Sequence, residues 1–102
     1  MLAVSRFHVE EGEAAAFVRR AHAAVAFMAA RDGCESAELL RNLDDADLWV
    51  ISSRWRNVGS YRRAFNGYDA KVVLVALLSE AIDEPSAYDR PEDVGENQPR
   101  AR

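Results

Sequence analysis

Histidine and tyrosine side chains are the groups of this chain best suited to moving a proton. His22 lies in an alanine-rich stretch, and a histidine with a reference pKa of about 6.5 can act as a general base near neutral pH. Tyr61 and Tyr88 carry phenol groups, which can hold a proton or share a hydrogen bond with a ligand. We take these three residues as candidate catalytic residues. The alternative is that His22 is a partly buried helix residue and that both tyrosines belong to the core.

Aromatic rings stand where they could line a pocket for a flat, apolar ligand. Trp55 closes an alternating stretch, and a ring at a strand end can stack on a planar molecule. Phe17 lies on an apolar helical stripe, and Phe65 follows Tyr61 by four residues, which puts both rings on one helix face. Phe17, Trp55 and Phe65 are therefore candidate substrate-binding residues. Core packing is the alternative for all three.

Several other kinds of site lack the residues that they need. His8 and His22 lie in different predicted elements and have no accompanying carboxylate motif, so we predict no metal site. The sequence contains no glycine-rich phosphate loop, nucleophile elbow or dinucleotide fingerprint. Cys34 is the single cysteine, which rules out an intrachain disulfide and fits a reducing compartment.

Charge and hydropathy exclude two kinds of partner. The 102 residues carry a net charge of −4, and no basic stripe is present that could neutralise a nucleic-acid backbone. No apolar run reaches the length of a membrane span, and the N-terminal residues lack the pattern of a secretory signal. We expect a cytoplasmic protein that binds neither nucleic acid nor membrane.

The hydrophobic pattern predicts four strands and two helical regions, the second in two parts. Residues 2–9 and 48–55 alternate with a period of two, whereas 13–31 carries apolar residues every three or four positions. The predicted order along the chain is strand 2–9, helix 13–31, strand 35–42, strand 48–55, helix 57–65, helix 70–78 and strand 86–90.

Segment 70–78 is ambiguous, because its run of valines and leucines also fits a buried strand. Asp69 as a helix cap and the continuation beyond residue 78 favour a helix. Asn57 is the expected N-cap of the preceding helix, because its side chain can accept a hydrogen bond from a free backbone amide.

This order corresponds to the ferredoxin-like βαββαβ arrangement, an α+β fold with a four-stranded antiparallel sheet and helices on one face. Alternation puts Trp49 on one face of its strand and Leu48 on the other. One apolar sheet face is left uncovered, and a second copy packing sheet to sheet would cover it as a homodimer. We expect one domain over residues 1–90 and a mobile polar tail over 91–102.

Four short stretches carry a family resemblance. The first is Glu11-Gly12, which opens the helix that contains Phe17-Val-Arg-Arg-Ala-His22, and the second is Asp32-Gly33-Cys34, which leads into Glu38-Leu-Leu. The third is Trp49-Val-Ile-Ser-Ser-Arg-Trp55, which is followed by Tyr61-Arg-Arg-Ala-Phe65. The fourth is the closing Asp83-Glu-Pro-Ser-Ala-Tyr88. Together, over residues 2–90, they resemble the antibiotic biosynthesis monooxygenase family of small α+β-barrel proteins.

The resemblance implies a homodimeric α/β barrel with a pocket between sheet and helices in each subunit. Family members oxygenate aromatic polyketides such as anthrones with O2 and without flavin, metal or heme, so it implies no cofactor. The substrate supplies the electrons as a carbanion or phenolate. In these enzymes, Asn, Trp, Tyr and Arg side chains interact with the phenolic oxygens of the substrate. The candidates of these types in this chain are Asn66, Trp55, Arg54 and either Tyr61 or Tyr88.

A second branch of the resembled family degrades heme with a His, a Trp and an Asn. The matching positions in this chain hold Val73, Ala64 and Ser5, so heme degradation is disfavoured. Ser5 is kept as a further candidate substrate-binding residue.

Two hypotheses of different classes follow. The first is a cofactor-independent monooxygenase-like protein that acts with O2 on a small aromatic substrate such as an anthrone or phenol. The second is a module of the same fold that binds a small ligand or a partner without catalysis. A third possibility is an isomerase or decarboxylase, which would need proton transfer but no oxygen.

Overall fold

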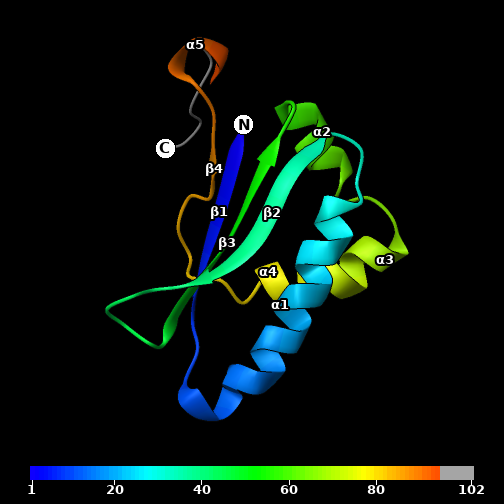
Figure 1. The fold of residues 1–102 in the computed structure, drawn as a ribbon. Helices are drawn as coiled ribbons and strands as arrows, with labels where there is room; N and C mark the ends of the chain where they lie inside the picture. Colours follow the sequence, from blue (N-terminus) through cyan, green and yellow to red (C-terminus); the bar gives the residue numbers. More distant parts are fainter. Residues whose placement is uncertain (95–102) are drawn as a thin grey trace.

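Four strands form one antiparallel sheet in the computed structural model, which describes residues 1–94 (Figure 1). The strand order across the sheet is β2-β3-β1-β4, so the two sequence-distant strands β1 and β3 lie at its centre. The predicted α+β ferredoxin-like fold is confirmed. The strands are β1 (Leu2–His8), β2 (Cys34–Arg41), β3 (Leu48–Trp55) and β4 (Ala87–Tyr88).

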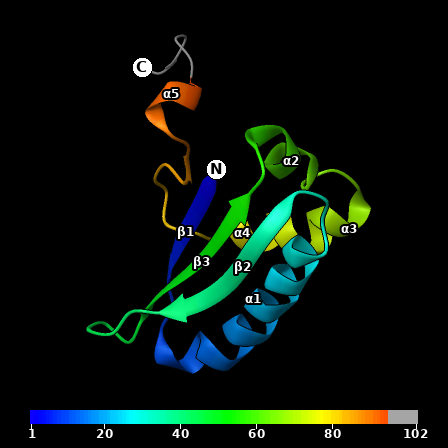
Figure 2. The same cartoon turned by 45° about the horizontal axis from the view of Figure 1, so that its top comes forward.

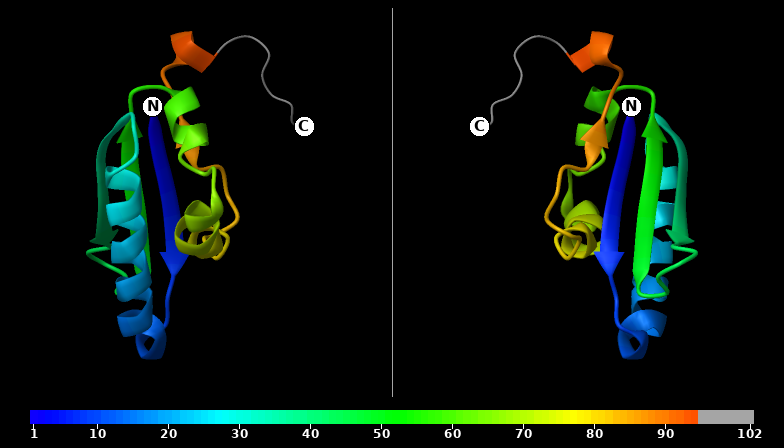
Figure 3. Two further views of the ribbon diagram at one scale, coloured as in Figure 1. Left: turned by 90° about the vertical axis from the view of Figure 1, so that its right-hand side faces the viewer. Right: turned by 90° about the vertical axis from the view of Figure 1, so that its left-hand side faces the viewer.

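The helices α1 to α4 pack against one face of this sheet. Figure 2 shows α1 running along the sheet, with α3 and α4 beside it. The left panel of Figure 3 shows α1 in front of β2 and β3 and the later helices beside β1, and the right panel shows β1 and β3 with no helix before them. The helical elements are η1 (Glu11–Glu13), α1 (Ala14–Ala29), α2 (Val58–Arg63), α3 (Tyr68–Ala70), the π-helical η2 (Lys71–Val75), α4 (Ala76–Leu78) and α5 (Pro91–Val94).

Strand alternation places the core between sheet and helices. In the register of β1 with β3, Phe7 pairs with Trp49 and Ala3 pairs with Ser53, and all four side chains are buried. The predicted face of β3 is therefore confirmed. Phe17, Ala21, Ala24 and Met28 of α1 complete this layer, because their spacing of three and four residues forms one stripe.

The opposite sheet face has no helix over it within residues 1–94. Its apolar side chains alternate with the buried ones along β1 and β3 and continue onto β2, where Leu40 is 46% exposed. We call this surface the apolar open face, and its residues are Leu2, Val4, Leu40, Leu48 and Val50.

Two predicted caps have different outcomes. The Asn57 side chain accepts a 2.9 Å hydrogen bond from the Ser60 backbone amide, which confirms it as the N-cap of α2. Asp69 does not cap the next helix. Gly67 occupies that N-cap position with a φ of 98°, and Asp69 lies in the first turn instead. Segment 70–78 is helical as predicted, although its middle is wound as a π-helix.

The last predicted strand is shorter than residues 86–90. Only Ala87 and Tyr88 pair, with Ala3 and Leu2, whereas Ser86 contributes a carbonyl that accepts a hydrogen bond from the Val4 amide. Of the predicted tail 91–102, residues 91–94 form the helical turn α5, and residues 95–102 lie outside the described part of the chain. No helix within residues 1–94 combines the length and the hydropathy needed to cross a bilayer.

Candidate active site

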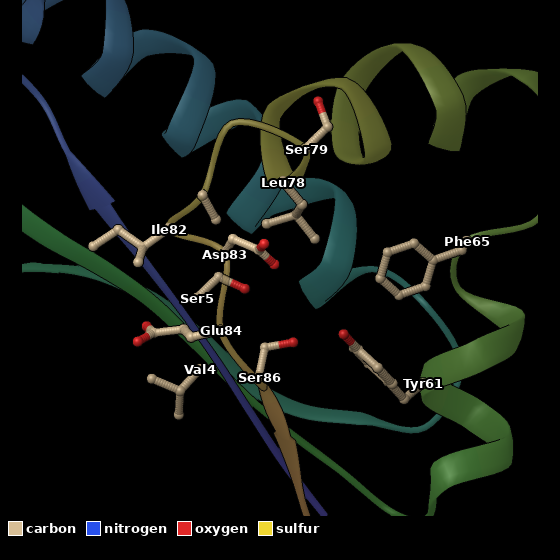
Figure 4. Close-up of a pocket in the computed structure, with 11 residues that line it drawn as sticks. Val4, Ser5, Tyr61, Phe65, Leu78, Ser79, Ile82, Asp83, Glu84 and Ser86 are labelled. Atoms are coloured by element: carbon tan, nitrogen blue, oxygen red, sulfur yellow. The ribbon is translucent and has the colours of Figure 1, made fainter. Parts of the chain in front are cut away.

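A cavity of about 340 Å³ lies at the edge of the sheet, between β1, α2 and the segment that follows α4 (Figure 4). A volume of this size is within the range of small-molecule sites. Side chains from three separate parts of the chain line it: Val4, Ser5, Tyr61, Phe65, Leu78, Ser79, Ala81, Ile82, Asp83, Glu84 and Ser86.

Backbone hydrogen bonds hold the segment 79–86 against β1. The amide of Val4 donates to the carbonyl of Ser86 over 2.7 Å, and the amide of Ile82 donates to the carbonyl of Arg6 over 2.8 Å. These two bonds use the edge of β1 that β4 leaves unpaired. They fix the intervening residues, including Asp83, beside the cavity.

One wall of the cavity is aromatic. The rings of Tyr61 and Phe65 meet edge to face, with centroids 5.0 Å apart, as their spacing on one helix face predicts. The ring of Trp55 packs against Tyr61 from behind, at 5.7 Å. Trp55 is only 1% exposed, and its indole Nε1 donates to Ser53 Oγ over 2.8 Å. Trp55 therefore supports the wall and does not line the cavity.

Hydroxyl groups form a second wall. Figure 4 shows the Tyr61 and Ser86 hydroxyls directed toward one another across the cavity, with Ser5 on the neighbouring strand. Burial raises the pKa of Tyr61, and a side-chain hydrogen bond with Ser86 acts in the opposite direction. Because the net shift is upward, Tyr61 stays protonated at neutral pH and can donate a hydrogen bond to an oxygen atom of a ligand.

Two adjacent carboxylates at the cavity have different surroundings. Glu84 accepts two hydrogen bonds from the guanidinium of Arg6, at 2.7 and 2.8 Å, and this pairing lowers the pKa of Glu84. Asp83 has no ion-pair partner within residues 1–94. Its carboxylate points into the cavity in Figure 4. Asp83 is thus the cavity carboxylate that is not engaged in an ion pair and can contact a ligand.

Three of the predicted site residues come together in this cavity, namely Ser5, Tyr61 and Phe65. Phe17 is buried elsewhere, with its ring 5.1 Å from Phe7 and 5.6 Å from Trp49. Its stripe on α1 therefore serves the core, which was the alternative interpretation.

The other predicted residues lie away from the cavity. His22 is exposed on α1, because the neighbouring Ala21 already faces the core and the next residue turns outward. Arg54 is exposed and pairs with Leu2, on the open side of the sheet. Asn66 is exposed after α2. Tyr88 is 53% exposed on the edge strand, where its hydroxyl donates to the carbonyl of Pro85 over 3.3 Å.

Asp83 and Ser86 are two of the eight cavity residues that sequence reasoning missed. Both belong to the closing stretch that carried part of the family resemblance, yet no periodic pattern marks which of its side chains turn inward. Within the described part of the chain, no group of three or more His, Cys, Asp or Glu residues is placed to hold a metal ion.

Comparison with known proteins gives a family and several structural relatives. The model of the antibiotic biosynthesis monooxygenase family matches residues 1–71. No curated protein matches the chain. Similar structures include a protein from Deinococcus radiodurans, with a TM-score of 0.73 and 16% identity over 92% of this chain and 95% of its own.

Two further structures share this fold. SnoaB, a cofactor-independent oxygenase from Streptomyces nogalater solved as a point mutant, has a TM-score of 0.68 and 26% identity over 79% of this chain and 82% of its own. A conserved protein from Methanosarcina mazei has a TM-score of 0.69 and 17% identity over 84% of both chains.

Proposed function

This chain belongs to the antibiotic biosynthesis monooxygenase family, and from that premise we propose that it is a cofactor-independent monooxygenase. Its substrate would be a small, flat aromatic compound with an acidic C–H or phenol group, such as an anthrone. The structural likeness of this chain to SnoaB, a cofactor-independent oxygenase, supports this proposal. The cavity lined by Tyr61, Phe65, Ser86 and Asp83 is the proposed active site.

The observation that carries this proposal is the division of the cavity into an aromatic and a polar wall. Tyr61 and Phe65 offer ring surface to a planar molecule. The hydroxyls of Tyr61 and Ser86 can hold a phenolic or carbonyl oxygen, while Asp83 is the base that removes the acidic proton.

The proposed reaction needs only groups that the cavity and its reactants supply. Asp83 takes one proton from the methylene carbon of the substrate, and the resulting anion is delocalised onto an oxygen held by Tyr61. The anion donates electrons to O2, a carbon–oxygen bond forms, and the proton returns to give a hydroperoxide. Loss of water leaves a ketone, so that one CH2 group and one O2 become C=O and H2O.

A non-catalytic binding module is the second candidate. Of the four residue types that handle phenolic oxygens in the resembled enzymes, only a tyrosine lies at the cavity, since Trp55 is behind the wall and Asn66 and Arg54 are exposed elsewhere. This departure favours ligand binding without turnover over an intact catalytic set.

We also propose that the protein is a homodimer formed through the apolar open face. Five apolar side chains share that face with polar neighbours such as Arg6 and Ser52, and a chain of this size gains stability by covering such a surface. The dimeric state typical of the family supports this assembly.

Oxygen consumption with a simple anthrone tests the proposed site. We expect Tyr61→Phe and Asp83→Asn each to lower kcat by about tenfold or more, because each removes a group that binds or moves the proton. Tyr68→Phe and Asp44→Asn are matched controls, since Tyr68 is 78% exposed and Asp44 lies in the exposed turn after β2.

Unchanged rates in both cavity variants would contradict the assignment of these two residues. No oxygen consumption by the wild-type protein, together with quenching of its tryptophan fluorescence by the anthrone, would support the binding module instead.

A further inference from the structure

Arg6 contacts the segment 79–86 twice, once on each side of Asp83. Its backbone carbonyl accepts the 2.8 Å hydrogen bond from the Ile82 amide. Its guanidinium donates from Nε and Nη2 to the two carboxylate oxygens of Glu84, over 2.8 and 2.7 Å. A single residue of β1 therefore holds both chain neighbours of the proposed base, and Asp83 lies between the two contacts.

The contact with Glu84 fixes the direction in which the two adjacent carboxylates turn. In Figure 4 the Glu84 carboxylate is turned away from Tyr61, whereas the Asp83 carboxylate is directed into the cavity. A planar guanidinium that binds both oxygens sets the orientation of a carboxylate as well as its distance. Because Ile82 and Glu84 are both held, the backbone between them has little freedom to rotate, and the Asp83 side chain keeps its direction.

The Arg6–Glu84 pair is suited to positioning rather than to holding the fold together. Its two side chains are 44% and 28% exposed, and an ion pair in contact with water adds little to stability. The pair nevertheless joins a central strand to a stretch of chain, residues 79–86, that contains no helix or strand. Such a stretch takes its conformation from the contacts that it makes with the sheet.

We propose that Arg6 is a positioning residue for Asp83, an inference that rests on the proposed oxygenase function. By binding Glu84, Arg6 directs the Asp83 carboxylate into the cavity and neutralises the second carboxylate beside it. Asp83 then meets the acidic proton of the substrate in one geometry. A base that is already oriented transfers the proton faster than one that must first rotate into place.

Arg6→Gln and Glu84→Gln each break this contact from one end. We expect each variant to lower kcat for anthrone oxygenation by about fivefold or more, because the base is no longer oriented. KM should change by less than about twofold, since the aromatic wall that binds the ring is intact. The double variant should be no slower than the slower single variant, because both remove the same contact. A wild-type kcat in Arg6→Gln would overturn the proposal.

The Arg20–Glu80 pair provides a matched control. Its guanidinium also binds both carboxylate oxygens, at 2.9 and 3.0 Å, and it ties the start of the same segment to α1. Neither of its residues lines the proposed active site. We expect Arg20→Gln to keep the kcat of the wild type. An equal loss of kcat in Arg20→Gln and Arg6→Gln would show that any anchor of the segment serves, and would overturn the specific role of Arg6.

The side-chain rotamer of Asp83 gives a readout that needs neither substrate nor turnover. Three-bond NMR couplings from the backbone nitrogen and carbonyl to Cγ report whether χ1 has one value or several. We expect one rotamer of Asp83 in the wild type and in Arg20→Gln, and averaging over several in Arg6→Gln and in Glu84→Gln. Averaged couplings in the wild type, or a single rotamer in both variants of the pair, would overturn the positioning role.

These readouts separate the two proposals. Averaging of the Asp83 rotamer only when the pair is broken, in a protein that does not consume oxygen, would overturn the oxygenase and leave the orientation of Asp83 by Arg6. Oxygen consumption with the same kcat in wild type and Arg6→Gln would overturn the positioning role and leave the oxygenase. Glu84→Gln decides the matter if Arg6→Gln does not fold, because it breaks the same contact from the other side.

Discussion

Gly33 and Ser60 lie so close together that position 33 has room for only a hydrogen atom. A Cβ at Gly33 would stand 2.3 Å from Ser60 Oγ, and the glycine has a φ of +89°. Ser60 is almost completely buried, and its hydroxyl accepts hydrogen bonds from Arg56 and Arg63. This contact joins the turn after α1 to the first turns of α2, the helix that carries Tyr61.

Gly33→Ala is expected to destabilise the fold by about 2–4 kcal/mol, because it combines a left-handed backbone with overpacking. The free energy of unfolding in urea measures this effect. Gly12→Ala is the control, since no atom lies within 4 Å of its added Cβ. Equal stability of the two variants would show that the close approach at Gly33 is relieved at no cost.

At the level of single residues, sequence reasoning found the aromatic half of the site better than the polar half. Tyr61 and Phe65 were predictable because helical spacing fixes their common face. His22 lies one position past the buried Ala21, and a step of one residue on a helix turns a side chain out of the stripe. Asp83 was not predictable, because its orientation depends on two long-range backbone bonds to β1.

Helix α2 is the element on which the proposed site depends most. It spans only Val58–Arg63, and helices this short have little stability of their own. Its position therefore relies on its ends. Asn57 caps the first turn through the Ser60 amide, and Tyr61 lies one turn further along.

Asn57→Ala is expected to cost about 1 kcal/mol of stability through loss of the N-cap. It should also weaken anthrone binding, since Tyr61 is on the helix that loosens. Urea denaturation and fluorescence quenching measure the two effects. Asn66→Ala, an exposed position after the same helix, is the control. If both variants equal the wild type in stability and in anthrone binding, the Asn57 cap does not fix the position of Tyr61 in the cavity wall.

The elements themselves followed from the sequence where periodicity was strong. Strand β3 has the predicted bounds, because its alternation extends over eight residues and a tryptophan ends it. The π-helical turn at Lys71–Val75 could not be predicted, because the same residues fit regular helix or strand and only packing decides between them. Strand β4 pairs with β1 over only two residues, and its own residues do not reveal where that pairing ends.

Within residues 1–94, one side of the sheet has no layer over it. A sheet with helices on one face only must cover the other face or expose it to water, and the apolar open face carries leucine and valine. Sequence alternation was enough to divide the strand residues between two faces and to predict that one apolar face is uncovered, because its period is two. It left open which of the two faces the helices cover. The geometry of the proposed dimer depends on a second copy and is not encoded in that pattern.

Val50→Lys places a charge at the centre of the apolar open face, on β3. We expect this variant to be a monomer where the wild type is a dimer, because the charge would be desolvated in the interface. Sedimentation equilibrium gives the masses. Val72→Lys is the control, since Val72 is exposed on the helical side. A dimer that survives Val50→Lys would place the interface elsewhere.

The most direct test of the proposed function is the initial rate of reaction of an anthrone under 18O2, with mass analysis of the product. We predict a rate well above autoxidation, one 18O atom in each product molecule, and loss of the excess rate in Tyr61→Phe. A wild-type rate equal to autoxidation, at anthrone concentrations that quench the tryptophan fluorescence fully, would contradict the oxygenase and leave a binding protein.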